Sequence, residues 1–416
     1  MEALGHEDET LEYDLALTGE QREIRETARR FAREVLRPVG IRLDRMAPGE
    51  VIASGSPLYD ALAQAARLGF TRLRAPLSLG GLEAAPATEH IVLEELAYGS
   101  AGLAGVIFLS PFPAAAAAAS GNPELAAEFS APYFACNDAS IIGCWAITEP
   151  NHGSDQLGVM RPELRVKARG DLAARRDGDS WILNGQKSAW VSNGPIATVG
   201  VVNVQLQPRD GLEHGGVCIV PLNLPGVSRG RPLDKHGFRA LPQGEIFFED
   251  VRIPRRYMIA EDETYPAHVE NTLTAFNASV GALATGIARA AFDCALAYAK
   301  TRIQGGRPIF EHQSVRDRLF RMASLVRAAR ALSRDVYVYN LTRLGRGEPG
   351  RLDHSITSKV FCTNAALEVA TLAAQLHGGN GMTREYPVEM FVRDATASTI
   401  ADGENAYLGQ IAASML

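Results

Sequence analysis

The sequence is poor in cysteine, and its few cysteines are not spaced as a disulfide framework or a zinc site. There are five, an odd number, and no two of them form a C-x-x-C pair. Structural zinc sites and disulfide-rich secreted domains both need closely and regularly spaced cysteines. We therefore expect reduced thiols, no metal and a cytoplasmic location for a chain that carries Cys136, Cys144, Cys218, Cys294 and Cys362.

The chain also lacks an excess of positive charge. Its 42 basic and 48 acidic side chains give a formal net charge of −6, which argues against nucleic acid or an anionic membrane as a partner. The first residues, MEALGHEDETLEYD, are acidic and have no apolar core, so we do not expect a signal peptide. One stretch, residues 96–123, is uncharged and long enough to span a bilayer. Its prolines, glycines and run of alanines predict buried, broken helices instead.

Length and composition predict a globular protein of two or three domains. A chain of 416 residues is too long for one ordinary core, and 46% hydrophobic residues are far more than a disordered chain contains. Residues 1–140 show the apolar spacing of helices. The first helix is expected to begin at a capping box of Thr18 and Gln21. Pro38 is expected to end it.

The remaining chain divides into a β region and a second helical region. Residues 141–255 alternate like short strands separated by turn signals such as DGD, NG and PRDG. Residues 256–416 return to helical spacing, with long helices over 271–303, 313–344 and 355–377 and a last one from about residue 387. The predicted fold class is α+β multidomain: an N-terminal α-helical domain, a middle antiparallel β domain and a C-terminal four-helix bundle. A cleft where three domains meet is a preferred ligand site.

Two segments of the β region carry donors suited to a cofactor. WAITEPNHGSD (145–155) ends a strand in a turn rich in hydroxyls and backbone N–H groups, which can line a flat heteroaromatic ring or a phosphate. NGQKSAWVSNG (184–194) brings Trp190 and Ser192 back beside it. The alternatives are a surface β-turn for the first segment and a sandwich-core tryptophan for Trp190.

Two segments of the second helical region complete the set. RIQGGRPIFEHQ (302–313) places Arg302 at a helix end, where a guanidinium can bind a diphosphate bidentately. The alternative is a solvated arginine favoured by the helix dipole. QLHGGNGMTREYPVEMFVRDA (375–395) offers a glycine-rich turn that a ligand can approach closely, or only a helix cap.

Together and in this order, the four segments resemble the acyl-CoA dehydrogenase family, and the resemblance covers nearly the whole chain. Family motifs such as TEPxxGSD, FEDVxxP and Q-x2-GGNG-x4-YPVE-x4-RDA occur at the family's spacing. The resemblance implies a flavoprotein oxidoreductase with FAD between the β domain and the bundle, assembled as a homotetramer or homodimer. It implies FAD contacts from Trp145, Ile147, Thr148, Ser154, Trp190, Ser192, Arg302, Gln313, Gln375, Gly379 and Glu404. It implies substrate contacts from Ser154, Phe276, Asn277 and Gly403.

The resemblance also implies how FAD would be divided between subunits. Ile147 and Thr148 would meet the flavin ring and Ser154 the pyrophosphate, while Trp190 and Ser192 would cover the other side of the ring. The bundle residues Arg302, Gln313, Gln375 and Gly379 would hold the pyrophosphate and ADP portion, the latter residues coming from a neighbouring subunit.

The stretch STIADGENAYLGQ (398–410) holds the residue that the resemblance makes catalytic. In the family this stretch usually reads like IYEGTSQIQ, and its glutamate removes the α-proton of an acyl thioester while the β-hydrogen leaves as hydride to flavin N5. Here that position is Asp402, preceded by Ala401 instead of a tyrosine. Some relatives carry the base in the long helix, where this chain has Phe276, and the neighbouring family arginine is Asn277.

Aspartate has the acid–base chemistry that this reaction needs, but it is one methylene shorter, about 1.5 Å of reach. A misplacement near 1 Å can cost on the order of 10²-fold in rate. Ala401 leaves room beside the base, which is consistent with a branched or cyclic acyl group. Glu404 is a lower-ranked candidate for the base, and a solvated Asp402 in a member without dehydrogenase activity is the remaining interpretation.

Three functions are compatible with these residues. The first is FAD-dependent α,β-dehydrogenation of an acyl-CoA or acyl-ACP with Asp402 as base, passing electrons to an electron-transfer flavoprotein. The alternative is a flavin-dependent monooxygenase or oxidase on the same scaffold in secondary metabolism, which the altered DGEN stretch and Asn277 favour somewhat. The third is a DNA-associated protein without turnover, which would need a basic C-terminal face that the net charge of −6 opposes.

Overall fold

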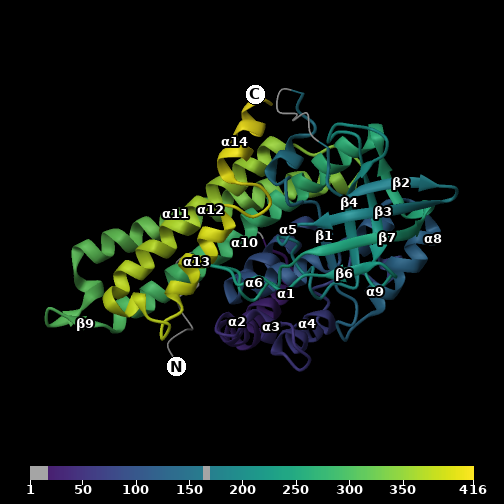
Figure 1. The fold of residues 1–416 in the computed structure, drawn as a ribbon. Helices are drawn as coiled ribbons and strands as arrows, with labels where there is room; N and C mark the ends of the chain where they lie inside the picture. The colour runs from purple at the N-terminus through teal and green to yellow at the C-terminus, as the bar shows by residue number, and fades with distance from the viewer. Residues whose placement is uncertain (1–16, 163–168) are drawn as a thin grey trace.

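The computed structural model describes residues 17–162 and 169–416, which form three domains in the expected order. In Figure 1 the sheet lies on the right, the N-terminal helices lie below and beside it, and the long C-terminal helices extend to the left. The predicted division into an N-terminal helical domain, a middle β domain and a C-terminal helical domain is confirmed.

The first helix begins at its predicted cap but does not end where expected. The Thr18 hydroxyl accepts the Gln21 N–H, and the Gln21 side-chain oxygen accepts the Thr18 N–H, both at 3.1 Å. Pro38 does not stop the helix, because a π-turn at Ala32–Leu36 leads directly into a second helix. Proline is tolerated there because the first turn of a helix needs no N–H donor. The helices of this domain are α1 (Gly19–Phe31), α2 (Arg37–Asp44), α3 (Pro48–Val51), α4 (Pro57–Arg67), α5 (Pro86–Gly99), α6 (Ala101–Leu109), α7 (Phe112–Ala119), α8 (Pro123–Leu125) and α9 (Ala131–Ala135).

The uncharged stretch forms buried, broken helices, as expected. α6 ends at Leu109 and α7 begins at Phe112, and Pro111 between them is the N-cap of α7. By length and composition alone, Ala101–Ala119 and Asp262–Thr301 could each cross a membrane, yet most of each lies buried against the rest of the protein. Their apolar surface is therefore used in packing the core.

The middle domain is a mixed sheet rather than a purely antiparallel one. Its strands follow the order β6-β7-β3-β2-β4-β5-β8, and β1 pairs with β4 beside this path. The β1–β4 and β2–β4 pairs are parallel, which is possible because long connections separate these strands in the chain. The strands are β1 (Gly143–Ala146), β2 (Ala173–Asp177), β3 (Ser180–Lys187), β4 (Val199–Leu206), β5 (Gly215–Pro221), β6 (Val227–Arg229), β7 (Ile246–Pro254) and β8 (Met258–Glu261).

The C-terminal domain is built on three long helices that pack along one another. α10 contacts both of the others and also α5 of the N-terminal domain. Small residues on α10 allow this close approach: a Cβ added at Gly286 would lie 2.6 Å from the Glu94 carbonyl oxygen. The elements are α10 (Tyr265–Thr301), β9 (Ile303–Gln304), β10 (Arg307–Pro308), α11 (Gln313–Gly345), α12 (Leu352–His377), α13 (Val388–Ser398) and α14 (Asn405–Ala413).

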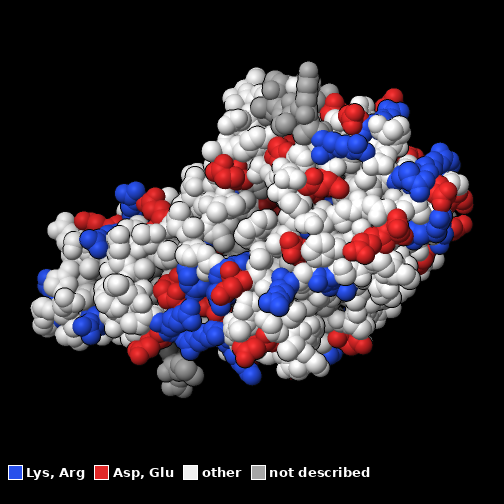
Figure 2. Space-filling model, viewed as in Figure 1, with Lys and Arg blue, Asp and Glu red and all other residues white. Residues whose placement is uncertain are grey.

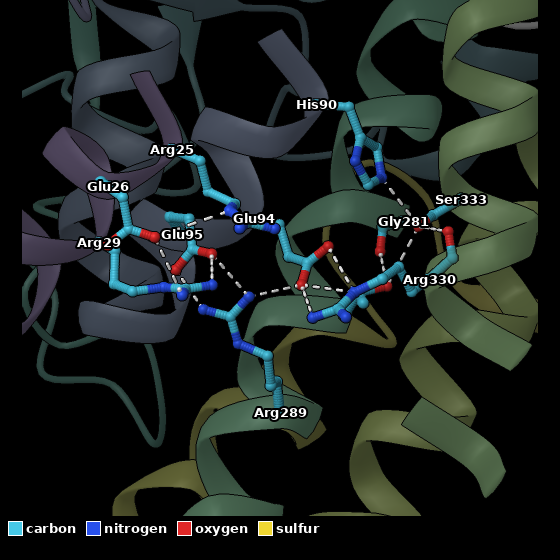
Figure 3. Close-up of polar contacts among 11 residues, drawn as sticks. Arg25, Glu26, Arg29, His90, Glu94, Glu95, Gly281, Arg289, Arg330 and Ser333 are labelled. Carbon is cyan, nitrogen blue, oxygen red and sulfur yellow. Dashed lines mark hydrogen bonds and ion pairs between the residues drawn. The ribbon is translucent and has the colours of Figure 1, made fainter. Parts of the chain in front are cut away.

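A buried ionic cluster joins the N-terminal domain to this bundle (Figure 3). The Glu94 carboxylate accepts from Arg289 at 2.8 Å and from Arg330 at 2.6 Å. The adjacent Glu95 accepts from Arg29 at 3.0 Å and again from Arg289 at 3.0 Å. These side chains come from α1, α5, α10 and α11, so the cluster fixes four helices together. Buried charges need such mutual pairing to offset the cost of leaving water.

Surface charge does not gather by sign on the face shown in Figure 2. Acidic and basic side chains are intermixed there, including at the junction between the bundle and the N-terminal helices. A phosphate backbone would need a continuous basic surface. This face therefore offers no support for a nucleic-acid partner.

Candidate functional site

A cavity of about 630 Å³ lies where the three domains meet. Its wall combines α5, α6 and α10 with the loops of the β domain and the turn between α13 and α14. The size and the mainly apolar wall are typical of a small-molecule site. The cavity brings together many of the predicted site residues, namely Trp145, Ile147, Thr148, Ser154, Trp190, Ser192, Phe276, Asp402 and Gly403.

One side of the cavity carries hydroxyl groups and an exposed indole. The Thr148 and Ser188 hydroxyls lie 2.8 Å apart, and the Gln243 side-chain amide donates to Ser192 Oγ at 3.0 Å. Trp190 is 61% exposed although it lines the cavity. A large aromatic side chain left open beside hydroxyls can be covered by a flat ring that stacks on it.

An aromatic cluster lies beneath these groups. Trp145 stacks on Phe276, and Phe112 meets Phe276 edge-on with ring centroids 5.0 Å apart. The Trp145 indole N–H donates to Asn203 Oδ1 at 3.1 Å, so it points into the sheet. Trp145 can therefore offer the cavity its ring but not its hydrogen-bond donor.

The turn that carries Asp402 forms another part of the cavity wall. Asp402 has a φ of 52° and Gly403 a φ of 106°, so two successive residues adopt left-handed backbone conformations. A Cβ at Gly403 would lie 2.7 Å from Leu408 and 2.9 Å from Leu157. Only glycine fits there, which explains why this helix-rich region contains a glycine after its aspartate.

The turn is held by side chains on three sides. The Asn277 amide donates to the Asp402 carbonyl oxygen at 3.3 Å, and the Glu404 N–H donates to Ser154 Oγ at 3.3 Å. Lys359 lies behind the turn and donates to the Gly403 carbonyl oxygen at 2.6 Å. Asn277 thus acts on the backbone of the turn and is not part of the cavity wall.

Two backbone donors of this turn are free. Among residues 17–162 and 169–416, the N–H groups of Asp402 and Gly403 donate to no protein acceptor. Both residues line the cavity. Free N–H groups on a rigid turn can stabilise a developing negative charge on a ligand oxygen.

The Asp402 carboxyl group is half-buried, and its pKa lies above that of an exposed aspartate. Burial raises its pKa to about 6, and the positive charge of Lys359 opposes this shift. A carboxylate with a pKa in this range is a stronger base than an exposed one and is still ionised at pH 7. The arrangement is therefore suited to accepting a proton from a ligand in the cavity.

Glu404 faces away from the cavity and caps a helix. Its carboxylate accepts the N–H groups of Ala406 and Tyr407, each at 3.0 Å, at the start of α14. These hydrogen bonds hold the pKa of the exposed Glu404 carboxyl below its usual range. A carboxylate in this position is a weaker base than Asp402 and is already engaged.

The predicted diphosphate and ADP residues are not at the cavity. Arg302 and Gln313 are exposed and lie before and after the β9–β10 hairpin in the chain, and β9 lies at the left tip of the bundle in Figure 1. Gln375 and Gly379 are exposed at the same end, where the Tyr298 and His377 rings of α10 and α12 stack with centroids 4.1 Å apart. The structure therefore groups these four residues with one another and separates them from Asp402.

Three potential metal ligands lie within 4.8 Å of one another, namely Glu149 and His152 of the 145–155 segment and Asp171. These groups already have partners: Glu149 pairs with Lys187 at 2.6 Å, and His152 Nδ1 lies 2.7 Å from Asp155. The cluster fixes the turn that presents Thr148 and Ser154 to the cavity.

Lys359 was not found by sequence reasoning. A signal existed, because a lysine stands among apolar positions of a helical pattern in SITSKVFCTNAAL. Its role depends on a turn 40 residues away, to which it donates at the Thr399 carbonyl oxygen. Local periodicity carries no information about such a contact.

Comparison with known proteins adds to this geometry. The family models described as acyl-CoA dehydrogenase N-terminal, middle and C-terminal domains match residues 18–135, 144–251 and 267–416. A probable acyl-CoA dehydrogenase, fadE25, of Mycobacterium leprae is 34% identical over 94% of this chain and 93% of its own length. Benzylmalonyl-CoA dehydrogenase of Aromatoleum aromaticum is 30% identical over 95% of this chain and 97% of its own. The structure of butyryl-CoA dehydrogenase from Megasphaera elsdenii superposes with a TM-score of 0.83 at 26% identity, covering 97% of this chain and 99% of that one.

Proposed function

The chain belongs to the acyl-CoA dehydrogenase family of flavoprotein oxidoreductases, and from that premise we propose an FAD-dependent acyl-thioester α,β-dehydrogenase whose base is Asp402. The resemblance seen in the sequence motifs is thereby confirmed at the level of the family. The observation that carries the proposal is the cavity itself. Asp402, whose carboxyl pKa is raised to about 6, lines the same cavity as Thr148, Trp190 and Ser192.

The residues of the cavity fit the ring end of FAD. An exposed indole at Trp190 and hydroxyls at Thr148, Ser154 and Ser192 supply a stacking surface and hydrogen bonds for a flat polar heterocycle. Bound FAD would supply the acceptor for the β-hydrogen of the substrate, which leaves with its electron pair. The protein's part is to orient the acyl chain between the ring and Asp402, exclude water and move the α-proton.

Asp402 would take the α-proton while its own backbone binds the thioester. The acidity of this proton rises when donors stabilise the negative charge that develops on the thioester oxygen. The free N–H of Asp402, and that of Gly403 beside it, are candidates for this contact. The carboxylate and the N–H donor would then lie on the same rigid turn. Because aspartate is shorter than glutamate, the α-carbon of the substrate would have to bind closer to the turn.

The acyl group is proposed to be branched or cyclic. Ala401 and Gly403 give the cavity two small residues beside the carboxylate, while Phe108, Phe276 and Val280 provide apolar surface. The name of the Aromatoleum relative denotes an acyl group that carries an aromatic ring, which supports a bulky substrate here. CoA or acyl carrier protein would be the carrier, and an electron-transfer flavoprotein would accept the electrons.

The ADP end of FAD is proposed to bind at the tip of the bundle of another copy of the chain. Arg302, Gln313, Gln375 and Gly379 are exposed and are not among the residues that line the cavity of their own subunit. Apolar side chains are also left open at this end of α10 and α12, with Ile303 58% and Met382 88% exposed. Such groups commonly become covered in an interface, which supports a homotetramer or homodimer.

A flavin-dependent oxidase or monooxygenase is the second candidate. The observation that favours it is that the two alternative base positions offer no carboxylate to the cavity, because one is Phe276 and the other, Glu404, caps α14. If the shorter aspartate does not reach the α-proton, the cavity could still hold a thioester beside a flavin, as an oxidase or monooxygenase requires.

Anaerobic flavin bleaching by a panel of straight, branched and alicyclic acyl-CoAs separates the dehydrogenase from a monooxygenase, and reoxidation of the bleached flavin by O₂ separates it from an oxidase. We expect one acyl class to bleach the flavin and the Asp402→Asn variant to lose this reaction by at least about 10²-fold. Asp250→Asn is the matched control, because Asp250 is also an aspartate with a left-handed φ of 51° but bonds to Asn184 on the β domain. Bleaching that survives in Asp402→Asn would remove Asp402 as the base. O₂ consumption and thioester modification by the chemically reduced enzyme, without acyl-CoA bleaching, would establish the monooxygenase class instead.

A further inference from the structure

Lys359 lies behind the catalytic turn, on a helix that contributes no residue to the cavity wall. The side chain is fully buried, with 0% of its surface exposed. Its ammonium group donates to the carbonyl oxygen of Thr399 at 3.1 Å, to that of Gly403 at 2.6 Å and to Asn405 Oδ1 at 2.7 Å. An ammonium has three donors, so each one has a partner, and all three partners are uncharged.

The three acceptors lie on both sides of Asp402 in the chain. The conformation they hold is unfavourable for a residue with a side chain, because Asp402 has a positive φ of 52°. Such a conformation persists only when the surrounding structure determines it. Asn405 is fixed in turn, since its amide donates to Thr363 Oγ1 and to Asn364 Oδ1, both at 3.1 Å.

We propose that Lys359 is a positioning residue for Asp402: its buried ammonium fixes the left-handed turn and favours the ionised form of the Asp402 carboxyl group. This inference rests on the proposed role of Asp402 as base. Lys359 would thus act in two ways, through its hydrogen bonds and through its charge. An uncharged side chain could hold the turn by hydrogen bonds but could not favour the ionised carboxylate.

The charges around the turn support this assignment. Burial raises the pKa of Asp402 to about 6, and Lys359 is the charge that opposes the rise. Burial lowers the pKa of Lys359 to about 8, and Asp402 and Glu404 oppose that shift. At pH 7 both side chains are therefore charged and stabilise each other.

Among the residues that the structure describes, Lys359 is the charged group that acts on the Asp402 pKa. α10 has no titratable side chain between residues 271 and 282, where it passes the turn. On η5 (Ser154–Gly158), Asp155 is negative and pairs with His152. Within the described part of the chain, the other titratable or charged groups around the turn and the cavity are Glu404 and Tyr407 on the turn and the start of α14, and Asp234, Lys235 and His236 on a loop that lines the cavity. The Lys235 ammonium donates to Phe238, Leu241 and Gln243 within its own loop.

The test measures the pKa of Asp402 with and without the lysine charge, using protein stability instead of turnover. Denaturation of the purified holoenzyme, Asp402→Asn, Lys359→Gln and the double variant is followed between about pH 4 and 8. Because folding raises the pKa of Asp402, its contribution to stability is present at low pH and is lost as the pH rises through the folded pKa. The difference between each protein and its Asp402→Asn counterpart therefore reports that pKa.

We expect Lys359→Gln to move the pKa of Asp402 upward by about one unit, as expected when a nearby opposite charge is lost. Glutamine retains N–H donors for the turn, so the variant separates charge from hydrogen bonding. Lys359→Met, which removes the donors as well, should give a similar shift and a greater loss of thermal stability. The low-pH limb of acyl-CoA bleaching should shift upward by the same amount.

Lys187→Gln is the matched control. Lys187 is also 0% exposed, but it bonds to Ile147 O at 3.1 Å and to Glu149 in the β domain. Its loss should destabilise the protein without moving the pKa of Asp402. An unchanged Asp402 pKa in Lys359→Gln, or an equal shift in Lys187→Gln, would overturn the proposal. Both outcomes are read from stability, so they are distinct from a failure of the dehydrogenase assignment, which would appear as the absence of bleaching in the unmodified enzyme.

Discussion

Trp145 and Phe276 stack with ring centroids 4.8 Å apart and an interplanar angle of 27°. Phe276 comes from α10 and Trp145 from β1, so the pair joins the bundle to the β domain at the wall of the cavity. Phe108 and Phe112 both meet Phe276 edge-on. The phenylalanine that stands where some relatives have a base thus serves as the centre of an aromatic cluster.

Phe276→Ala should enlarge the cavity and destabilise the fold. Removing a buried phenylalanine costs about 3–5 kcal/mol of unfolding free energy. We expect the acyl-CoA that bleaches the flavin fastest to become bulkier, because the lost ring leaves space beside Asp402. Phe292→Ala on the same helix is the control, since Phe292 is buried in the bundle core away from the cavity. Urea denaturation should show comparable losses for both, and an unchanged acyl preference in Phe276→Ala would contradict its place in the substrate wall.

Gly403→Ala should distort the catalytic turn. The new methyl group would lie 2.7 Å from Leu408 and would require a side chain at a φ of 106°. Overpacking of this kind costs about 1–3 kcal/mol, and the displaced carboxylate should lower the bleaching rate strongly. Gly409→Ala, in the middle of α14 with open space around it, should be neutral or stabilising by up to about 1 kcal/mol. Thermal denaturation measures both effects. Equal melting temperatures for Gly403→Ala and Gly409→Ala would show that the turn relaxes to accept the methyl group.

Glu94→Gln should be far more costly than the loss of an exposed ion pair. It leaves the buried guanidinium groups of Arg289 and Arg330 without their shared carboxylate, which costs about 3–5 kcal/mol. Glu368→Gln removes the exposed pair with Arg321 and should cost at most about 1 kcal/mol. Denaturant titrations at neutral pH compare the two directly. Equal losses would mean that the cluster does not join the domains as its geometry indicates.

Local patterns predicted the elements well, and non-local contacts account for what was missed. The capping box at Thr18 and the start of α11 at Gln313 depend on neighbouring residues alone and occur where expected. Pro38 was misread because a π-turn, which has no simple sequence signal, carries the helix past it. Parallel pairing of β1 with β4 and the bonds of Lys359 join segments far apart in the chain.

The same limit applies to the site. The sequence motifs predicted which residues line the cavity around Asp402, because each motif belongs to one turn or strand end. The capping role of Glu404 was not predicted, although a carboxylate before a helical run is a known N-cap signal. The raised pKa of Asp402 depends on burial by three domains, which no single segment specifies.

FAD binding should cover Trp190. This indole is 61% exposed in the cavity, whereas Trp181 is 5% exposed in the sheet core. Acrylamide quenching of tryptophan fluorescence should therefore detect an accessible indole in the apoprotein that becomes protected when FAD is added. Trp190→Phe should abolish the accessible component, and Trp181→Phe should leave it. Protection that persists in Trp190→Phe would place the flavin elsewhere.

The pH dependence of bleaching should report the ionisation of Asp402. The base must be deprotonated to accept the α-proton, so the rate constant should fall tenfold per pH unit below an apparent pKa of about 6. Two effects set this value: burial raises the pKa above that of an exposed aspartate, and Lys359 limits the rise.

Asp402→Glu is the informative companion variant, because it restores the reach of the glutamate common in the family and keeps the carboxylate. We expect the variant to retain an acid limb and to shift acyl preference toward substrates that sit farther from the turn. Stopped-flow bleaching from about pH 5 to 8 measures both properties, and a pH-independent rate in the unmodified enzyme would exclude Asp402 as the group that removes the proton.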